Sequence, residues 1–364
     1  MDNTCGGDLS PLSWAVMSAT PESAAVPSDP WHEDVLGSDF QCRDLHLGPD
    51  PEGEGDAVAT VVRHRPSGAG ADFSNRPALL WVSGMTDYFF QEHVARHFHD
   101  HGYAFYAVDL RKCGRARQEG QRWHYSTDLT NYFPDLTASL ALITEAGHPS
   151  LTPIAHSTGG LVASLWLDQL RRTSPARHHR IGGLVLNSPW LDMQYPDWLV
   201  RLLRPVLKAF GTKLPDLKIP GGNLGTYGAS IHSSRHGEWD FDTRMKPLGG
   251  HPKYVIWLRA VLAGQAKVHR GEVDVGVPAL TLCSTKSYLG QPYSAASDTA
   301  DTVLDVDQIQ RWAPSLGEDI TVTALAGARH DVFLSLPHAR EAALTTSTQW
   351  LDERVREAGG PDVS

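Results

Sequence analysis

The stretch that decides the fold reads Ile154-Ala155-His156-Ser157-Thr158-Gly159-Gly160. An apolar run over residues 151–155 leads into a serine held between small residues, and a helix-like run over residues 161–170 follows at once. A strand, a sharp turn at serine and a helix make up a nucleophile elbow, which exposes the serine hydroxyl at the top of a sheet. The usual pattern is G-x-S-x-G, and Ala155 takes the place of its first glycine. The stretch predicts that Ser157 is a catalytic nucleophile; a serine that only caps the helix is the alternative.

Strands and helices alternate on both sides of this stretch. Short runs rich in apolar residues predict strands over residues 40–47, 57–64, 78–83, 103–110, 151–156, 181–187, 277–283 and 320–325. Amphipathic segments predict helices over residues 91–101, 129–145, 158–172, 305–316 and 337–355. Continuous apolar runs indicate that both faces of the sheet are covered, as in a parallel sheet flanked by helices. The pattern therefore predicts an α/β fold with a mostly parallel central sheet.

The alternation breaks after Trp190. Residues 191–271 contain two helical segments, 198–210 and 254–266, around a middle that is rich in glycine, proline and aromatic residues. We interpret this region as a mainly helical cap inserted into the core. The N-terminal residues are rich in Ser, Pro, Ala and Gly with little periodicity, which predicts a poorly ordered extension. The chain is thus expected to consist of an extension, a core and a cap: residues 1–36, residues 37–190 with 272–364, and residues 191–271.

The composition bounds the class of protein and its partners. With 41% hydrophobic and 20% charged residues, the 364-residue chain can build a large core. A net charge of −10 without a basic block argues against nucleic acid or an anionic membrane surface as a partner. The sequence shows no secretory signal pattern and no run of ~18 apolar residues, so we expect no transmembrane segment. Four scattered cysteines favour reduced thiols and a cytoplasmic location: Cys5, Cys42, Cys113 and Cys283.

The histidines do not form a metal-binding pattern. His97, His99 and His101 lie two positions apart, a spacing that does not place them on one helix face, and the HExxH motif is absent. We therefore expect no metal site. No pattern in the sequence determines whether the chain forms homo-oligomers.

A serine hydroxyl becomes a useful nucleophile when a histidine removes its proton and an acid holds that histidine. The expected order along the chain is serine, acid and histidine, each partner following a late strand. His330 directly follows the strand predicted over residues 320–325 and precedes the last helix, as the base should. His156 is adjacent to the nucleophile, and we expect it to pack behind the turn. His330 is therefore the predicted base.

The acid is expected in the loop over residues 284–302, after the strand predicted at 277–283. This loop contains Asp298 and Asp301. Two further aspartates just beyond it have structural explanations. Asp305 begins a D-x-x-Q capping signature, and Asp307 would lie in the first helical turn, where a carboxylate suits the helix dipole. Asp301 is the predicted acid, and Asp298 is the alternative.

An oxyanion hole needs two backbone N–H donors beside the nucleophile. One is expected from Thr158, which immediately follows Ser157. The other is expected from Met85, in the loop that ends the first core strand after Ser83 and Gly84. The alternative is that Ser83-Gly84 only ends a strand. Because backbone donors leave no side-chain signature, these two assignments rest on position in the sequence.

The motifs resemble those of the monoacylglycerol lipase, lysophospholipase and S33 serine aminopeptidase-like group of α/β-hydrolases, over about residues 40–355. The matching segments are residues 83–85 for the HG-x loop, 108–115 for D-x-R-G-x-G-x-S, 156–160 for H-S-M-G-G, 301–303 for the acid and 327–332 for G-x-x-H-E/D. Three departures stand out. Ser83 replaces the usual histidine, Lys112-Cys113 interrupts the arginine–glycine turn, and residues 283–286 replace H-G-x-x-D, so that the acid is displaced by a longer loop.

The resemblance implies a serine hydrolase of the α/β-hydrolase fold that acts on esters or amide-like bonds without metal or organic cofactor. The aromatic residues of the cap and its edge favour an apolar acyl ester, a glyceride-like substrate or a lactone over a charged peptide. We expect Trp190 and Tyr88 to bind the substrate. Acyl transfer or C–C bond hydrolysis with the same residues is the alternative, followed by a binding protein of the same fold without catalysis.

Overall fold

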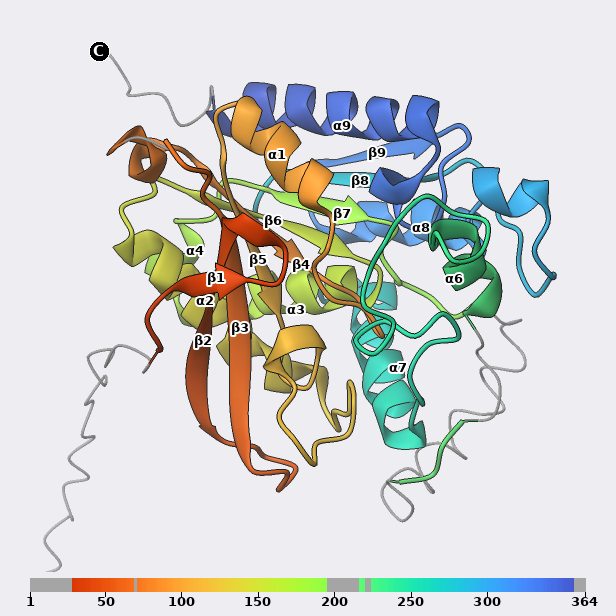
Figure 1. Cartoon of the computed structure of the whole chain (residues 1–364), viewed down its shortest axis with the longest axis horizontal. Coiled ribbons are helices and arrows are strands. Elements are labelled where there is room, and N and C mark those ends of the chain that lie inside the picture. Colours follow the sequence, from red (N-terminus) through yellow and green to blue (C-terminus); the bar gives the residue numbers. More distant parts are fainter. Residues whose placement is uncertain (1–27, 69–70, 195–215, 220–223, 357–364) are drawn as a thin grey trace, which may run out of the picture.

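The computed structural model describes residues 28–68, 71–194, 216–219 and 224–356. Across these residues a nine-stranded sheet forms the centre of the molecule, with helices on both of its faces (Figure 1). The strands are β1 (His32–Asp34), β2 (Gly37–Pro49), β3 (Asp56–His64), β4 (Ala78–Val82), β5 (Ala104–Asp109), β6 (Leu151–His156), β7 (Leu184–Asn187), β8 (Ala279–Ser284) and β9 (Ile320–Leu325). Their order in the sheet is β1-β2-β3-β5-β4-β6-β7-β8-β9.

The first three strands form an antiparallel end of the sheet, and β3 also pairs antiparallel with β5. Every pair from β5 through β4, β6, β7 and β8 to β9 is parallel. This arrangement confirms the predicted α/β fold with a mostly parallel sheet. Parallel strands end at the same edge, so the loops after β4, β6, β8 and β9 come together there.

The helices cover the two faces of the sheet. They are α1 (Glu92–Asp100), α2 (Phe133–Glu145), α3 (Thr158–Thr173), α4 (Pro175–His178), α6 (Gly225–Ile231), α7 (Val255–His269), α8 (Val306–Trp312) and α9 (Pro337–Leu351). Turns of 3₁₀ helix lie at Ala71–Asn75, Gly114–Ala116, Leu129–Tyr132, Ala295–Thr299, Ala313–Leu316 and Val332–Leu334, and a π-helical turn lies at Asp352–Arg356. α1 and α9 pack on one face and α2 and α3 on the other (Figure 1).

β4 shows why the strand runs are continuously apolar. Its side chains alternate between the two faces. Leu79 and Trp81 pack on the side of α1 and α9, whereas Leu80 and Val82 pack on the side of α2 and α3. All four side chains are buried, because each face of the sheet carries a helical layer.

Strand β1 lies in the N-terminal stretch for which the sequence predicted little order. Its three residues, His-Glu-Asp, carry no apolar pattern. The strand is held instead by a buried ion pair, since the Asp34 carboxylate lies 2.6 Å from Nε of Arg115, which also pairs with Asp109 at 2.8 Å. Residues 1–27 lie outside the described part of the chain.

Part of the region predicted as a cap is described, namely residues 191–194, 216–219 and 224–271. It contains α7, close to the predicted helix at 254–266, and α6, which the sequence did not predict. A Cβ atom on Gly228 of α6 would collide with the backbone of Leu248. This glycine therefore allows the short helix to pack directly against the backbone at Leu248. The helix predicted at 198–210 lies outside the described residues.

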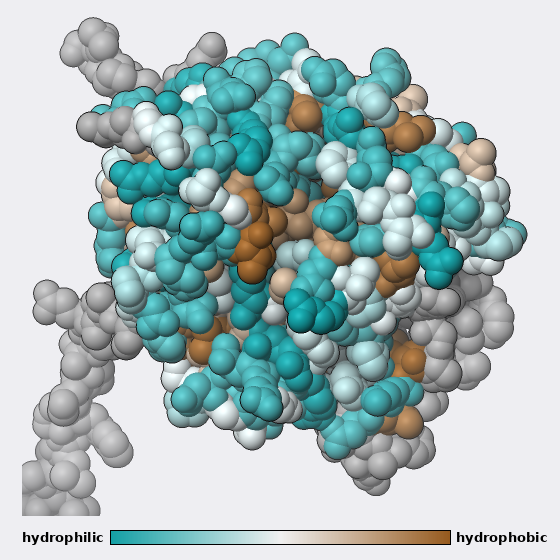
Figure 2. Space-filling model, viewed as in Figure 1, coloured by the Kyte–Doolittle hydropathy of each residue, from teal (hydrophilic) through white to brown (hydrophobic). Residues whose placement is uncertain are grey.

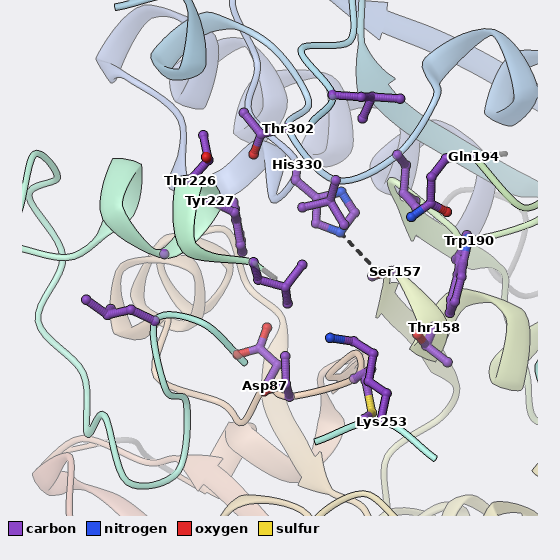
Figure 3. A pocket seen from close by; sticks show the side chains of 18 of the residues that line it. Asp87, Ser157, Thr158, Trp190, Gln194, Thr226, Tyr227, Lys253, Thr302 and His330 are labelled. Atoms are coloured by element: carbon purple, nitrogen blue, oxygen red, sulfur yellow. Dashed lines mark hydrogen bonds between the residues drawn. The ribbon is translucent and has the colours of Figure 1, made fainter. Parts of the chain in front are cut away.

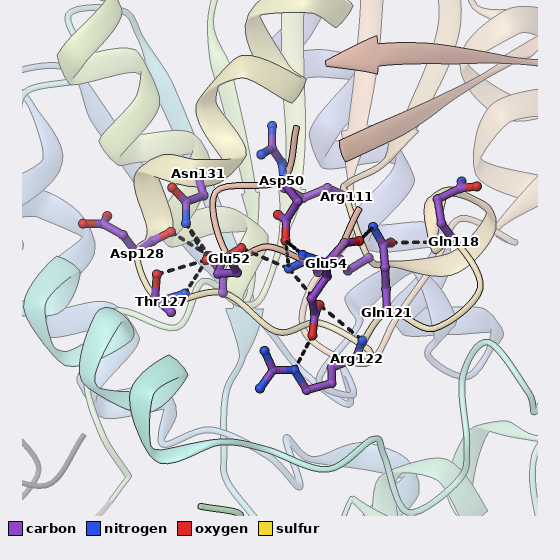
Figure 4. A network of polar contacts seen from close by, with 12 residues as sticks. Asp50, Glu52, Glu54, Arg111, Gln118, Gln121, Arg122, Thr127, Asp128 and Asn131 are labelled. Atoms are coloured by element: carbon purple, nitrogen blue, oxygen red, sulfur yellow. Dashed lines mark hydrogen bonds and ion pairs between the residues drawn. The ribbon is translucent and has the colours of Figure 1, made fainter. Parts of the chain in front are cut away.

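Lys112, in the loop after β5, forms ion pairs with carboxylates of the turn between β2 and β3. Figure 4 shows these carboxylates, Asp50, Glu52 and Glu54, and the polar residues around them. The φ of Lys112, +61°, lies in the left-handed region that favours glycine, the residue of the related pattern at this position. Its ammonium nitrogen lies 2.7 Å from Asp50, 3.0 Å from Glu52 and 2.9 Å from Glu54. These buried contacts offset the backbone strain, and the lysine takes over a position that the pattern assigns to glycine.

The face of the molecule in Figure 2 is mostly hydrophilic, with hydrophobic side chains in small areas. Large hydrophobic side chains that are exposed in the described chain include Val35, Leu217 and Leu336. Isolated apolar side chains of this kind are ordinary on a protein surface. Among the described helices, none is long and apolar enough to cross a membrane.

Candidate active site

Ser157 occupies a strained turn between β6 and α3. Its φ of +53° and ψ of −119° are unusual for a residue with a Cβ atom. The neighbouring glycines are required by close packing, because a Cβ on Gly159 would come within 2.6 Å of the Ser83 carbonyl oxygen and one on Gly160 within 2.8 Å of Pro189. Ala155, at the place of the missing first glycine, is buried in β6 without forcing the strand apart. The stretch thus has the predicted strand–turn–helix geometry.

His330 links Ser157 to Asp301. Its Nε2 lies 3.0 Å from Oγ of Ser157, and its Nδ1 lies 2.9 Å from Oδ2 of Asp301. With Nδ1–H donated to the carboxylate, Nε2 is left to accept the serine proton. The other carboxylate oxygen of Asp301 accepts the N–H groups of Val303 and Leu304, each at 2.8 Å. The structure therefore brings the three residues predicted as a triad into one hydrogen-bonded row.

Asp301 reaches His330 although it stands far beyond the end of β8 in sequence. Its N–H donates to the carbonyl oxygen of Lys286 at 3.0 Å, and its own carbonyl accepts the N–H of Tyr288 at 2.7 Å. Residues 289–300 therefore form a loop that leaves the sheet edge and returns to it. Asp301, the predicted acid, thus lies beside the extension of β8, and the longer loop accounts for its displacement in sequence.

The other aspartates near this loop are held elsewhere. Asp298 lies 2.8 Å from Nη2 of Arg329 and accepts the hydroxyl of Tyr293 at 2.9 Å. Asp305 caps α8 by accepting the N–H of Asp307, as predicted, whereas Gln308 of the predicted capping signature donates to the carbonyl oxygen of Met193. Of these carboxylates, the structure brings Asp301 to His330. Asp298 pairs instead with Arg329, the residue that precedes His330.

The loop after β4 passes directly over the nucleophile. A Cβ on Gly84 would lie 3.0 Å from Cβ of Ser157, and Met85, Ser157 and Thr158 line the same cavity. Thr158 is the first residue of α3, so its N–H has no acceptor within the helix. The loop is fixed by Thr86, whose N–H donates to Nδ1 of His124 at 3.2 Å and whose hydroxyl accepts the N–H of His251 at 2.7 Å. Met85 and Thr158, the predicted oxyanion donors, thus line the same cavity as Ser157.

A cavity of about 690 Å³ opens above Ser157 and His330. Figure 3 shows its labelled side chains, with Trp190 and Gln194 on one side of the serine and Asp87, Thr226 and Tyr227 on the other. Its apolar lining comes from Trp190, Met193, Ile219, Leu224, Phe241, Leu248, Trp257, Leu258, Leu289, Val303 and Leu304. Trp190 was predicted to bind substrate and lines the cavity. Tyr88 is not among the described lining residues: its hydroxyl accepts the N–H of Asp242, and its ring packs against Phe90.

The sequence matches the family model of serine aminopeptidase S33 over residues 74–336, more than half of the chain. The chain belongs to the serine aminopeptidase S33 family. This membership confirms the resemblance to this group of α/β-hydrolases, and the fold confirms it independently. No curated protein matches the sequence significantly.

Solved structures share the fold of this S33 family member at low sequence identity. A soluble monoglyceride lipase variant from Saccharomyces cerevisiae has a TM-score of 0.61 and 16% identity, covering 90% of this chain and 99% of its own. A carboxyl esterase from Bacillus coagulans has a TM-score of 0.57 and 15% identity, covering 88% of this chain and 100% of its own. A monoacylglycerol lipase from Paleococcus ferrophilus has a TM-score of 0.53 and 17% identity, covering 77% and 96%. Similarity at this level establishes a common α/β-hydrolase fold.

Sequence reasoning missed a buried ion pair in the wall of the cavity of this S33 family member. Nζ of Lys246 lies 2.7 Å from Oδ1 of Asp87, and both side chains are buried. The other oxygen of Asp87 is buried and has no hydrogen-bond partner in the described chain. The position of Asp87 two residues after Met85 was a possible signal, but nothing in the local sequence marks Lys246, which comes from the region predicted as a cap.

His156 is buried next to Ser157, and it is among the residues that line the cavity, whereas the sequence predicted that it packs behind the turn. Its Nδ1 lies 3.1 Å from the Asn187 carbonyl oxygen, and its ring centre lies 4.7 Å from that of His330. Burial lowers the pKa of His156 to about 4, so its ring is neutral at pH 7 and adds no charge beside the base. Cys283 lies in β8. Its burial, and to a smaller extent the charge of Asp301, raise the pKa of its thiol to about 12, so the thiol stays protonated.

Proposed function

We propose that this S33 family member is a serine hydrolase that cleaves carboxylic esters with an apolar acyl group through Ser157, His330 and Asp301. The observation that carries the proposal is the hydrogen-bonded row of Oγ, imidazole and carboxylate, at 3.0 and 2.9 Å. A serine, a histidine and a buried acid in this order allow proton transfer from the nucleophile and stabilisation of the resulting imidazolium.

The reaction follows from this geometry in two halves. Oγ of Ser157 attacks the ester carbonyl carbon while Nε2 of His330 takes its proton. The N–H groups of Met85 and Thr158 hold the negative oxygen of the tetrahedral intermediate. The imidazolium then donates its proton to the departing alcohol, which leaves an acyl group on Ser157. In the second half His330 removes a proton from water, the hydroxide attacks the acyl carbon, and the free acid leaves as the serine regains its proton.

The lining of the cavity supports an ester with an apolar acyl part. Two tryptophans, Trp190 and Trp257, and several aliphatic side chains surround the space beside Ser157. The lining contributed by residues 191–271 supports the view that this region is a cap over the catalytic residues. The monoglyceride lipase and carboxyl esterase structures with the same fold add to the case for a glyceride-like or other apolar ester. A lactone is a cyclic ester, so it offers Ser157 the same ester carbonyl.

A fluorophosphonate probe and a graded series of esters test this function. We expect the probe to label the wild-type protein and not Ser157→Ala, and we expect hydrolysis to favour apolar acyl chains over short charged amides. Release of free acid, measured by chromatography, distinguishes hydrolysis from acyl transfer to an added alcohol. Equal labelling of the wild-type protein and Ser157→Ala would contradict the mechanism.

A further inference from the structure

Asn187, the last residue of β7, contacts the turn that carries the nucleophile. Its backbone carbonyl oxygen accepts the N–H of Ser157 at 3.0 Å and lies 3.1 Å from Nδ1 of His156. The parallel pairing of β6 with β7 sets His156 opposite Asn187. A strained serine persists in its turn only when the surrounding structure holds it. Asn187 supplies one of the hydrogen bonds that hold this turn.

The side chain of Asn187 contacts the loop that carries His330. Its Nδ2 donates to Oδ1 of Asp331 at 2.7 Å, and its Oδ1 accepts the N–H of Val332 at 3.1 Å. Both polar ends of the amide are therefore used, and both are bonded to residues that directly follow His330. One residue thus joins the backbone of the nucleophile turn to the loop of the base.

Asp331 makes this attachment rigid. It is fully buried, and its carboxylate also accepts Nε2–H of Gln91 at 3.0 Å and the N–H of Phe333 at 3.0 Å. A buried carboxylate that loses one of its donors keeps the cost of its desolvation. The loop after His330 is therefore anchored on one side by the start of α1 and on the other by β7, the strand next to the nucleophile.

We propose that Asn187 is a positioning residue that sets the separation between Ser157 and His330, an inference that rests on the proposed hydrolase mechanism. Its side-chain hydrogen bonds in the described chain go to the Asp331 carboxylate and the Val332 N–H, and its own carbonyl oxygen accepts the N–H of Ser157, so it acts on the two catalytic residues through their neighbours and the backbone of the serine turn. The 3.0 Å separation of Oγ and Nε2 is the quantity under its control. A displacement of about 1 Å between reacting groups costs on the order of 10²-fold in rate.

Asn187→Ala removes the side-chain attachment and leaves the backbone contact to Ser157. We expect kcat for an ester to fall about 10- to 100-fold with KM nearly unchanged, because substrate binding does not involve this residue. The rate of fluorophosphonate labelling should fall by the same factor. Leu184→Ala is the matched control, because it creates a cavity in the core at the other end of β7. It should lower the melting temperature and leave kcat per folded molecule unchanged.

Asn187→Asp keeps the shape of the side chain and tests the same proposal through pH. It replaces the amide donor with a second carboxyl group beside Asp331, and two carboxylates this close do not both ionise readily. The titratable side chains bonded to Asn187 are Asp331 and His156. We expect the new pair to hold a shared proton at low pH and to lose it as pH rises. The variant should then show a descending limb of kcat/KM that the wild-type profile lacks.

The outcomes separate this proposal from the proposed function. Labelling of the wild-type protein that depends on Ser157 supports the hydrolase mechanism. If such labelling is seen and Asn187→Ala keeps kcat within about twofold while Asn187→Asp keeps the wild-type pH profile, the positioning role is overturned alone. If Asn187→Ala does not fold, the pH profile of Asn187→Asp decides. If the wild-type protein is never labelled at Ser157, both proposals fall together.

Discussion

At the scale of single residues, Asp301 and Asp298 show how two carboxylates of one loop acquire different tasks. Asp301 is fully buried and faces Nδ1 of His330, whereas Asp298 is partly exposed and pairs with Arg329. The distinction depends on which side chain returns to the edge of β8, and that depends on the backbone contacts of Asp301 with Lys286 and Tyr288. In the proposed mechanism, Asp301 is therefore the residue that orients His330.

Asp301→Asn should reduce kcat by roughly 10⁴-fold, because an amide no longer enforces the tautomer that lets His330 accept the serine proton. Asp298→Asn keeps the row of Ser157, His330 and Asp301 and should cause a much smaller loss. Steady-state kinetics of both variants, with circular dichroism as a check of folding, measure the difference. A greater loss in Asp298→Asn would move the acid to that residue.

Gly159 presents a second test at this scale. A methyl group at this position would meet the carbonyl oxygens of Ser83 and Val82 at 2.6 and 2.7 Å. We expect Gly159→Ala to abolish labelling of Ser157, since the turn must shift away from the loop after β4. Ala163, buried one turn later in α3, offers the control Ala163→Gly, which should cost about 1 kcal/mol of helix stability and keep the labelling. Full labelling of Gly159→Ala would show that the close approach is dispensable.

At the scale of elements, the turn between β2 and β3 is joined to the loop after β5 by Lys112. Burial is the largest single influence on the pKa of the Asp50 and Glu54 carboxyl groups and raises it. The hydrogen bonds and charge of Lys112, together with the other hydrogen bonds to Asp50 and the pairing of Glu54 with Arg122, lower it by more in sum, so both pKa values lie below their ordinary range. Carboxyl groups with a lowered folded pKa stabilise the protein above their unfolded pKa, and this contribution is lost as pH falls through the folded value. The ion pairs of Lys112 with Asp50 and Glu54 are therefore expected to stabilise the protein less under acid conditions.

Lys112→Met removes the charge that the carboxylates of Asp50, Glu52 and Glu54 share, of which Asp50 is buried and Glu54 is partly exposed. We expect the free energy of unfolding at pH 7 to fall by about 3–5 kcal/mol, because the carboxylates are left buried and less compensated. Urea unfolding measures the change. Arg244→Ala is the control, because this exposed arginine pairs with Asp242 at the surface. Its loss should not measurably change the free energy of unfolding. A stability of Lys112→Met equal to that of the wild-type protein would contradict the stabilising role of the Lys112 ion pairs.

At the scale of the whole molecule, several buried histidines make folding sensitive to acid. Burial lowers the pKa of His64, His93 and His156 to about 4 in each case. The unfolded chain binds a proton at each of them near pH 6.5, whereas the folded chain binds it only near pH 4. The unfolded state therefore holds more protons in this window, and the free energy of unfolding should decrease as pH falls from 6.5 towards 4.

His64→Phe tests this sensitivity at a site away from the proposed active site. Both ring nitrogens of His64 are buried without a hydrogen-bond partner in the described chain, and the ring packs against Phe40 and His99. The variant should flatten the decrease of stability between pH 6.5 and 4 and leave ester hydrolysis at pH 7 unchanged. Urea midpoints measured across this range provide the comparison. An unchanged slope would mean that His64 does not contribute to it.

Much of the architecture could be predicted from local sequence. The apolar runs of β4 and β6 and the glycines after Ser157 report directly on burial and close packing, so the strands, the turn and their order follow from the chain itself. β1 could not be predicted, because its attachment depends on Asp34 meeting the distant Arg115. α6 could not be predicted for a related reason. Its Gly228 is needed for close packing against the backbone of Leu248, a contact that the local sequence does not reveal.

The amino-acid sequence by itself determined the α/β fold, the strained serine turn and the two segments from which a histidine and an acid would come. Only the tertiary structure decided which aspartate faces His330, since a loop returns Asp301 to the sheet edge and turns Asp298 towards Arg329. It also brought Lys246 to Asp87 and Asn187 to Asp331. Local patterns record the burial and backbone needs of each residue, whereas partners that are distant in sequence become neighbours only when the sheet has assembled.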